Sequence, residues 1–235
     1  MTNVLIIAAH PDDEVLGCGG TIARLAREGA NVTIAILGEG MTSRYSDRNQ
    51  APREDLSLLQ SDSQRAADLL GAKALRTFDL PDNRFDTVPM LEVAKIIEGL
   101  IDETKPDRIF TQHGGDLNVD HVVIYRATLT AARPMEASTV QAVYSYEVAS
   151  STEWAFQSFA PNFTPQLFVD ISDTLELKVS AMELYQSERR AFPHPRSPEA
   201  LRAAAIHHGS AVGLRAAEAF HIIYDCRSGK GKTFE

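Results

Sequence analysis

The sequence contains few cysteines, no long apolar run and no excess of basic charge. Its 235 residues include two cysteines, Cys18 and Cys226, which are too few for a secreted disulfide framework and predict reduced thiols in a cytoplasmic protein. No segment approaches the roughly 20 apolar residues of a membrane-spanning helix, which argues against stable membrane insertion. The net charge of −9 argues against nucleic acid as a partner.

A dinucleotide-binding fingerprint is also missing. The glycine-rich segment Gly17–Gly20 (GCGG) lacks the required spacing. His10 occupies the tight turn that the pyrophosphate of such a cofactor would need. Nicotinamide chemistry is therefore not expected, and the glycines are explained by close packing or by another ligand.

Apolar segments of strand length alternate with segments of helical periodicity along the chain. We expect strands at residues 4–9, 31–37, 74–80, 107–111, 141–148, 166–170 and 218–226, and helices at 14–27, 53–70, 89–104, 121–132, 175–189 and 198–212. This alternation predicts an α/β fold with a mostly parallel, doubly wound sheet. We interpret residues 1–235 as a single domain, with a core over about 1–150 and a C-terminal subregion over about 151–226 packed on the same sheet.

Polar side chains follow four of the predicted strands, at the edge where open α/β sheets bind ligands. The candidates in chain order are His10, Asp12, Asp13, Glu39, Arg44, Asp82, Asn83, Arg84, His113, Asp116, Asn118, Asp120 and His121. We expect the two groups of histidines and carboxylates to converge although they lie over a hundred residues apart.

His10, Asp13 and His121 have the composition of a hydrolytic zinc site, because two imidazoles and one carboxylate leave a coordination position open. Imidazoles argue against calcium or magnesium, whereas ferrous iron accepts the same ligands, so iron stays open. Asp12 would lie beside the metal without binding it and could accept a proton from metal-bound water. Taken singly, His10 could be a core histidine, and either aspartate a helix N-cap.

Two motifs resemble signatures of the PIG-L/LmbE-like family of zinc-dependent N-deacetylases, which includes the GlcNAc-phosphatidylinositol de-N-acetylases. They are the segments Ala9–Gly17 (AHPDDEVLG) and Gly115–His121 (GDLNVDH), and weaker similarity extends over nearly the whole chain. The resemblance implies a Rossmann-like fold, with His10, Asp13 and His121 as zinc ligands and Asp12 as general base. It also implies hydrolysis of an N-acetyl group on a small amino-sugar substrate.

The sequence departs from the family pattern at Asn118, where several members have a histidine that is held to assist as an acid or electrophile. An amide cannot donate a proton to the leaving amine. Either His113 on the same loop takes that role, or Asp12 acts first as base and then as acid. We favour Asp12 in both roles, with His113 assisting.

Four residues are predicted to bind substrate. Arg44 and Asn118 lie on the rim loops, where Arg44 could bind a phosphate or hydroxyl but is equally explained as a solvated arginine. His194 and Arg196 lie in a proline-rich, extended segment that suits the presentation of side chains to a pocket.

Two other functions compete with deacetylation. A metal-dependent phosphoesterase would use similar residues, but the sequence offers ligands for one metal and not for a bridged pair. A non-catalytic module that binds a sugar or nucleotide-sugar would have no need of the unliganded carboxylate of Asp12. The sequence leaves open which amino sugar is the substrate and whether the chain forms a homo-oligomer.

Overall fold

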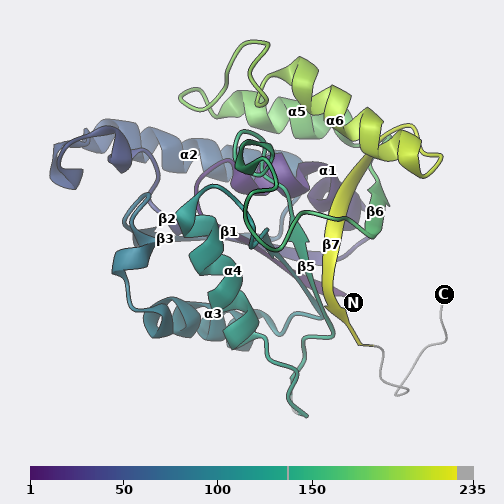
Figure 1. Ribbon diagram of the computed structural model, residues 1–235, viewed down its shortest axis with the longest axis horizontal. Helices are drawn as coiled ribbons and strands as arrows, with labels where there is room; N and C mark the ends of the chain where they lie inside the picture. Colours follow the sequence, from purple (N-terminus) through teal and green to yellow (C-terminus); the bar gives the residue numbers. More distant parts are fainter. Residues whose placement is uncertain (137, 227–235) are drawn as a thin grey trace.

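The computed structural model describes residues 1–136 and 138–226, which form a seven-stranded sheet between two layers of helices (Figure 1). The strands are β1 (Asn3–Ala8), β2 (Asn31–Gly38), β3 (Ala74–Leu80), β4 (Arg108–Gln112), β5 (Ala142–Tyr146), β6 (Leu167–Asp170) and β7 (Ala217–Asp225). The α-helices are α1 (Asp13–Arg27), α2 (Arg53–Leu70), α3 (Met90–Thr104), α4 (Val119–Ala131), α5 (Leu175–Leu184) and α6 (Pro198–Ala211). None of the helices in the described ranges is long and apolar enough to cross a membrane.

All of the predicted strands and helices are present, and the largest difference in their bounds is at the end of α5. The sequence predicted a helix to Arg189, but α5 ends at Leu184. The chain leaves the helix there, and its next residues make contacts with distant parts of the chain instead of continuing the helical hydrogen bonds. The hydroxyl of Tyr185 donates a hydrogen bond to the buried carboxylate of Glu14, and Glu188 faces Arg44.

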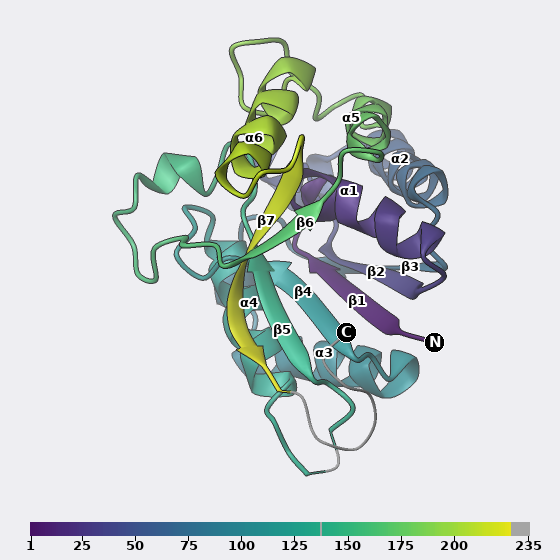
Figure 2. The ribbon, with the colours of Figure 1, turned by 90° about the vertical axis from the view of Figure 1, so that its right-hand side faces the viewer.

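The strand order is β3-β2-β1-β4-β5-β7-β6 (Figure 2). Strands β1 to β5 are parallel, and β7 is antiparallel to both of its neighbours, which confirms the prediction of a mostly parallel α/β sheet. Strand β1 lies between β2 and β4, so the direction of strand addition reverses there. In open α/β sheets this switch point, at the carboxyl ends of the strands, is the usual ligand site.

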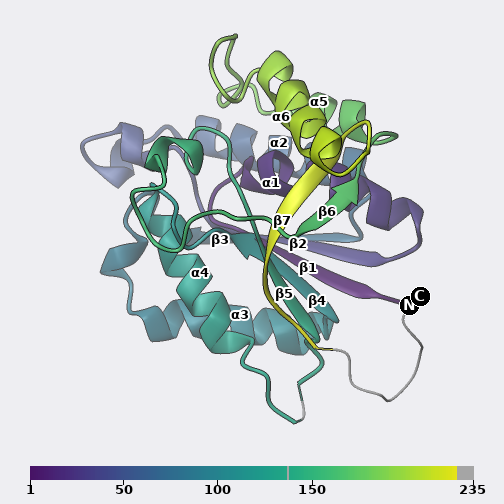
Figure 3. The ribbon, with the colours of Figure 1, turned by 45° about the vertical axis from the view of Figure 1, so that its right-hand side comes forward.

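Strand β1 is buried on both faces, which explains why its apolar run shows no alternation. Val4, Ile6 and Ala8 pack with α1, α2 and α5. Leu5 and Ile7 pack against α3 and α4 on the other face. Figure 3 shows these two helical layers on opposite sides of the sheet.

The residues after 150 extend this sheet and contact α1. Strands β7 and β6 pair in the same sheet as β5. In β7, the carboxylate of Glu218 accepts the backbone N–H groups of Gly20 and Thr21 at 2.9 and 2.7 Å. It also pairs with Lys178 of α5 at 2.7 Å. The C-terminal part of the chain therefore holds the helix that begins at the candidate site.

The glycines of α1 are explained by close packing. A Cβ atom on Gly17 would lie 2.1 Å from the ring of Tyr146, which is held by a hydrogen bond to the backbone carbonyl of Ile7.

We expect Gly17→Ala to lower the free energy of unfolding by about 1–3 kcal/mol or more, because the ring of Tyr146 must move. Gly99→Ala in α3, where a Cβ atom has no neighbour within 4 Å, is the control and should stabilise the protein by up to about 1 kcal/mol. Urea denaturation measures both changes, and equal effects would contradict the packing explanation.

Candidate metal centre and active site

The chain makes a tight turn between β1 and α1 that places three polar residues together. Asp12 has φ 105°, a left-handed conformation that residues other than glycine rarely adopt. Such strained residues often lie at functional sites. Asp13 is the first residue of α1, and its Oδ2 atom accepts the backbone N–H of His10 at 2.8 Å.

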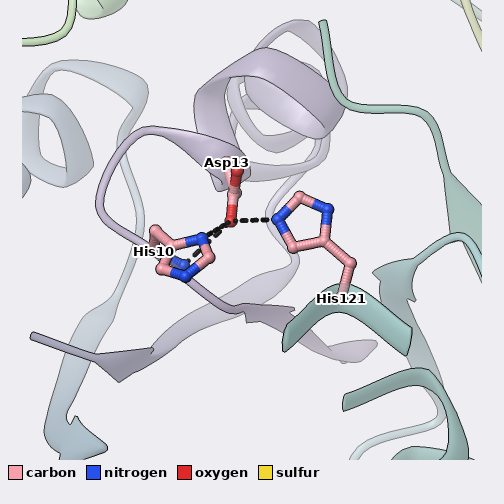
Figure 4. A group of neighbouring side chains, drawn as sticks. All are labelled: His10, Asp13 and His121. Atoms are coloured by element: carbon pink, nitrogen blue, oxygen red, sulfur yellow. Dashed lines mark hydrogen bonds and ion pairs between the residues drawn. The ribbon is translucent and has the colours of Figure 1, made fainter. Parts of the chain in front are cut away.

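The predicted ligands His10, Asp13 and His121 come together from three elements (Figure 4). Asp13 Oδ2 lies 3.3 Å from His10 Nδ1 and 3.2 Å from His121 Nε2. His121, on the first turn of α4, reaches the site across the β1/β4 switch point. One potential ligand atom from each residue lies within 4.8 Å of the others, so the three side chains could hold one metal ion.

Each histidine also faces a second carboxylate. His10 Nε2 lies 2.9 Å from Asp120 Oδ2, and His121 Nδ1 lies 3.1 Å from Asp116 Oδ2. Metal-binding histidines usually present their other ring nitrogen to such a carboxylate, which orients the imidazole. Both ring nitrogens of His121 are buried without a hydrogen-bond partner of good geometry, which is consistent with a side chain that binds a metal ion. The sequence analysis placed Asp116 and Asp120 among the polar residues of this edge but gave them no role. Their position within the second motif, beside His121, is the feature of the sequence that could have indicated one.

A second group, His10, Asp82 and Asp120, could also hold a metal ion. Its carboxylates, like that of Asp13, also accept hydrogen bonds from the protein. Asp120 Oδ1 accepts the backbone N–H of Phe85 at 2.9 Å, and Asp82 Oδ2 accepts the hydroxyl of Ser43 at 2.7 Å. Both groups share His10, and the trio with His121 is the one that the sequence predicted as the metal ligands.

The electrostatics of the site favour a cation. Burial alone would lower the pKa of His121, but Asp13 and Asp116 raise it to about 9. Burial would likewise lower the pKa of His10. The hydrogen bonds of His10 with Asp120 and Asp13 outweigh this effect and raise its pKa well above the usual value. The carboxylates therefore stabilise positive charge at the histidines, and a metal dication bound to neutral imidazoles would supply that charge.

A polar cavity of about 200 Å³ is lined by His10, Asp13 and His121, the candidate metal centre. Asp12 lines it beside the trio, and its Oδ2 atom accepts a hydrogen bond from Arg196 Nη1 at 2.6 Å. Burial raises the pKa of Asp12 well above its usual range, whereas the guanidinium of Arg196 opposes that rise. A carboxylate with a raised pKa in such a cavity is suited to exchange protons.

The structure brings three of the four predicted substrate residues to this cavity. Arg44, Asn118 and Arg196 line it. Asn118 also caps α4, because its side-chain oxygen accepts the backbone N–H of Asp120 at 2.9 Å. His194 is not among the lining residues. It packs edge-on against Trp154, and its Nδ1 atom accepts the backbone N–H of Arg196, so it supports the arginine instead.

The structure does not bring His113 to the cavity. This histidine is fully buried, and its Nε2 atom donates to the carbonyl of Pro161 at 2.7 Å. Its Nδ1 atom faces the hydroxyl of Ser145 at 3.2 Å, and its ring packs edge-on against Phe163. Both ring nitrogens are thus occupied by structural contacts. The proposed assisting role has no geometric support.

We expect His113→Ala to leave kcat for acetate release within about threefold, since the side chain contributes packing and no proton transfer. The free energy of unfolding should fall by about 2–3 kcal/mol, because a buried side chain is lost and the carbonyl of Pro161 loses its donor. Steady-state kinetics and urea denaturation test the two effects. A hundredfold loss of kcat in a folded variant would restore the catalytic role.

Asp116→Asn should weaken zinc binding by about 10–100-fold, because the amide orients the imidazole of His121 less well than the carboxylate does. Competition with a chromogenic chelator measures the zinc dissociation constant directly. Asp62→Asn is the matched control, since Asp62 is also buried but pairs with Arg65 on α2, away from the cavity. Equal zinc affinities in both variants would contradict the orienting role.

The fold and the site together define a class of α/β protein in which a His-Asp-His group that could hold a metal ion lies at the switch point of the sheet. The family model described as PIG-L, GlcNAc-PI de-N-acetylase, matches residues 5–132. The chain belongs to this family, which confirms the resemblance that its two motifs suggested.

Two curated relatives cover most of the chain. The probable N-acetyl-α-D-glucosaminyl L-malate deacetylase 2 of Bacillus cereus is 28% identical over 81% of this chain and 85% of its own length. The diacetylchitobiose deacetylase of Thermococcus kodakarensis is 27% identical over 94% of this chain and 82% of its own length. These relatives are named deacetylases, so the chain is assigned to the same class of enzyme, hydrolases of amide bonds.

Solved structures share the fold at lower identity. The N,N'-diacetylchitobiose deacetylase of Pyrococcus horikoshii superposes with a TM-score of 0.74 at 23% identity, covering 94% of this chain and 84% of that one. GalB, the 4-carboxy-2-hydroxymuconate hydratase of Pseudomonas putida, superposes with a TM-score of 0.75 at 19% identity, covering 99% and 100%. Because a hydratase also has this fold, the reaction has to be argued from the site residues.

Proposed function

We propose that this chain is a zinc-dependent hydrolase that removes the N-acetyl group from an amino-sugar derivative, with Asp12 activating the attacking water. The observation that carries the proposal is the position of Asp12. Its carboxylate lines the same small cavity as His10, Asp13 and His121 but belongs to neither possible metal-binding group. A binding module would have no use for such a carboxylate.

In this proposal His10, Asp13 and His121 hold the metal. Zinc at this position would polarise the amide carbonyl, lower the pKa of a water molecule and stabilise the developing oxyanion. Ferrous iron accepts the same residues and is the alternative metal. The carboxylates of Asp116 and Asp120 keep the two imidazoles oriented toward Asp13.

Asp12 then acts twice. It accepts a proton from water as the water oxygen bonds to the acetyl carbon, and it donates that proton to the amine nitrogen as the C–N bond breaks. Arg196 holds the carboxylate of Asp12 in place through one oxygen, at 2.6 Å. Arg44, Asn118 and Arg196 are proposed to contact the sugar, because all three line the cavity.

We also propose that the enzyme works in the cytoplasm, because Cys18 and Cys226 are both free thiols. The relatives suggest the substrate class. Diacetylchitobiose and N-acetyl-α-D-glucosaminyl L-malate both contain an N-acetylglucosamine unit, so derivatives of that sugar are the first substrates to test.

An acetate-release screen over N-acetylglucosamine derivatives tests the function, with added zinc and a chelator control. We expect acetate and free amine in equal amounts, dependent on metal, from at least one derivative. Metal content per chain and a parallel phosphate-release assay address the phosphoesterase alternative. Two tightly bound ions together with phosphate release would overturn the deacetylase proposal.

A further inference from the structure

Both arginines proposed to contact the sugar are already paired with one carboxylate, that of Glu188. Arg44 Nη2 donates to the two oxygens of Glu188 at 2.5 and 2.7 Å. Arg196 Nη1 lies 3.3 Å from Glu188 Oε2. Glu188 is 7% exposed and lines the same cavity as the two arginines. The three side chains form a charged bridge along one side of the cavity.

The bridge joins loops that are far apart in the sequence. Arg44 lies in the 3₁₀ turn Thr42–Arg44 after β2, whereas Glu188 and Arg196 lie between α5 and α6. Arg196 also donates from Nε to the hydroxyl of Ser150 at 2.8 Å and from Nη1 to Asp12. The Nε and Nη1 atoms of its guanidinium are thus divided among three acceptors of the protein itself.

The charges in the cavity balance without any anion from the substrate. Four lining carboxylates, those of Asp12, Asp13, Asp82 and Glu188, face the two arginines, and the proposed zinc dication would offset the two negative charges in excess. A phosphate or carboxylate on the substrate would have to displace Glu188 from the arginines or remain close to these carboxylates. Both alternatives are unfavourable where the local dielectric constant is low. An uncharged sugar meets no such penalty.

We propose that Glu188 is a specificity-determining residue that selects uncharged N-acetyl amino sugars over phosphorylated or carboxylated ones. The inference rests on the proposed deacetylase function. It deepens that function because the named substrates of the two relatives differ in this property, one being an uncharged disaccharide and the other a malate conjugate. Specificity of this kind comes from repulsion of the wrong ligand as much as from attraction of the right one.

The test compares N-acetylglucosamine with its 6-phosphate, a pair that differs by the charged group alone. We expect the wild-type zinc enzyme to favour the uncharged sugar in kcat/KM. Glu188→Gln keeps the shape of the side chain and removes its charge, so Arg44 becomes available to the phosphate. The ratio of kcat/KM for the phosphorylated to the unphosphorylated sugar should then rise by about tenfold. An effect of the substitution on the catalytic step at Asp12 would change kcat/KM for both sugars equally, because both undergo the same reaction. Such an effect therefore cancels in the ratio of the two kcat/KM values.

Two further variants make the result specific. Glu39→Gln is the matched control, because Glu39 pairs with Arg48 near the site but does not line the cavity, and the ratio should stay within about twofold. Adding Arg44→Gln to Glu188→Gln should reverse the gain. A wild-type preference for the phosphorylated sugar, or an unchanged ratio in Glu188→Gln, would overturn the inference.

Binding measurements separate this inference from the proposed function. If neither sugar released acetate, the deacetylase proposal would fail for these substrates. Dissociation constants of the same two sugars, measured by calorimetry, would still test whether Glu188 disfavours the charged sugar. Tighter binding of the 6-phosphate by Glu188→Gln than by wild type, relative to the uncharged sugar, supports the role of Glu188, and equal relative affinities overturn it.

Discussion

Asp12→Asn should reduce kcat for acetate release by at least about 10²–10⁴-fold while zinc remains bound. The amide has nearly the same shape as the carboxylate but cannot accept the proton of the attacking water. It can still accept the hydrogen bond that Arg196 now donates at 2.6 Å, so the local structure should persist. Single-turnover kinetics measure the chemical step, and elemental analysis gives zinc per chain.

The control for this variant is Asp82→Asn. Asp82 lines the same cavity, but its Oδ2 atom accepts the backbone N–H and the hydroxyl of Ser43 and so acts in the structure of the loop. We expect a loss of less than about tenfold. If Asp12→Asn kept more than about a tenth of wild-type kcat, another group would have to act as base.

Removal of the metal should abolish acetate release, and added zinc should restore it to the wild-type protein. Three carboxylates, those of Asp13, Asp116 and Asp120, surround His10 and His121, and we expect the group to bind a dication strongly only while both imidazoles are present. His121→Ala should therefore lose zinc and stay inactive at zinc concentrations that restore the wild type. The same titration with ferrous iron under anaerobic conditions identifies the metal that supports the higher kcat.

His207→Ala is the control for His121→Ala, because His207 lies exposed on α6, outside the cavity. It should bind zinc and release acetate as the wild type does. Full activity of chelator-treated protein, with zinc confirmed absent by elemental analysis, would contradict the metal-dependent mechanism. Zinc retained by His121→Ala at wild-type affinity would contradict the ligand set.

The C-terminal part of the chain contributes directly to the cavity. Arg196 and Glu188 precede α6 and contact Asp12 and Arg44 from the N-terminal half. Strand β7 holds the first helix through Glu218. The site thus depends on residues beyond the segment 5–132 that the family model matches. The proposed substrate selection and the proposed orientation of Asp12 both use residues of that later part.

The sequence by itself was sufficient to predict the strands and helices and to bring together the residues of the candidate metal centre. Continuous apolar runs such as that of β1, and the periodicity of apolar residues elsewhere, predicted every β-strand and α-helix of the described residues, because burial on one face or on two leaves a pattern in the sequence. The trio His10, Asp13 and His121 could be assembled because parallel strands end at one edge, and each residue follows a strand there. The family motifs led to the same residues.

Only the tertiary structure decided the contacts between side chains of distant loops. Arg44 and Glu188 are 144 residues apart, and neither loop has a regular pattern that indicates its partner. His113 follows β4 as the motif residues do, yet the loop carrying Pro161 draws its ring away from the cavity. Periodicity determines which face of an element is buried, whereas loop conformation and side-chain direction depend on what packs against them. For that reason the convergence of His10, Asp13 and His121 could be predicted, and the charged bridge beside them could not.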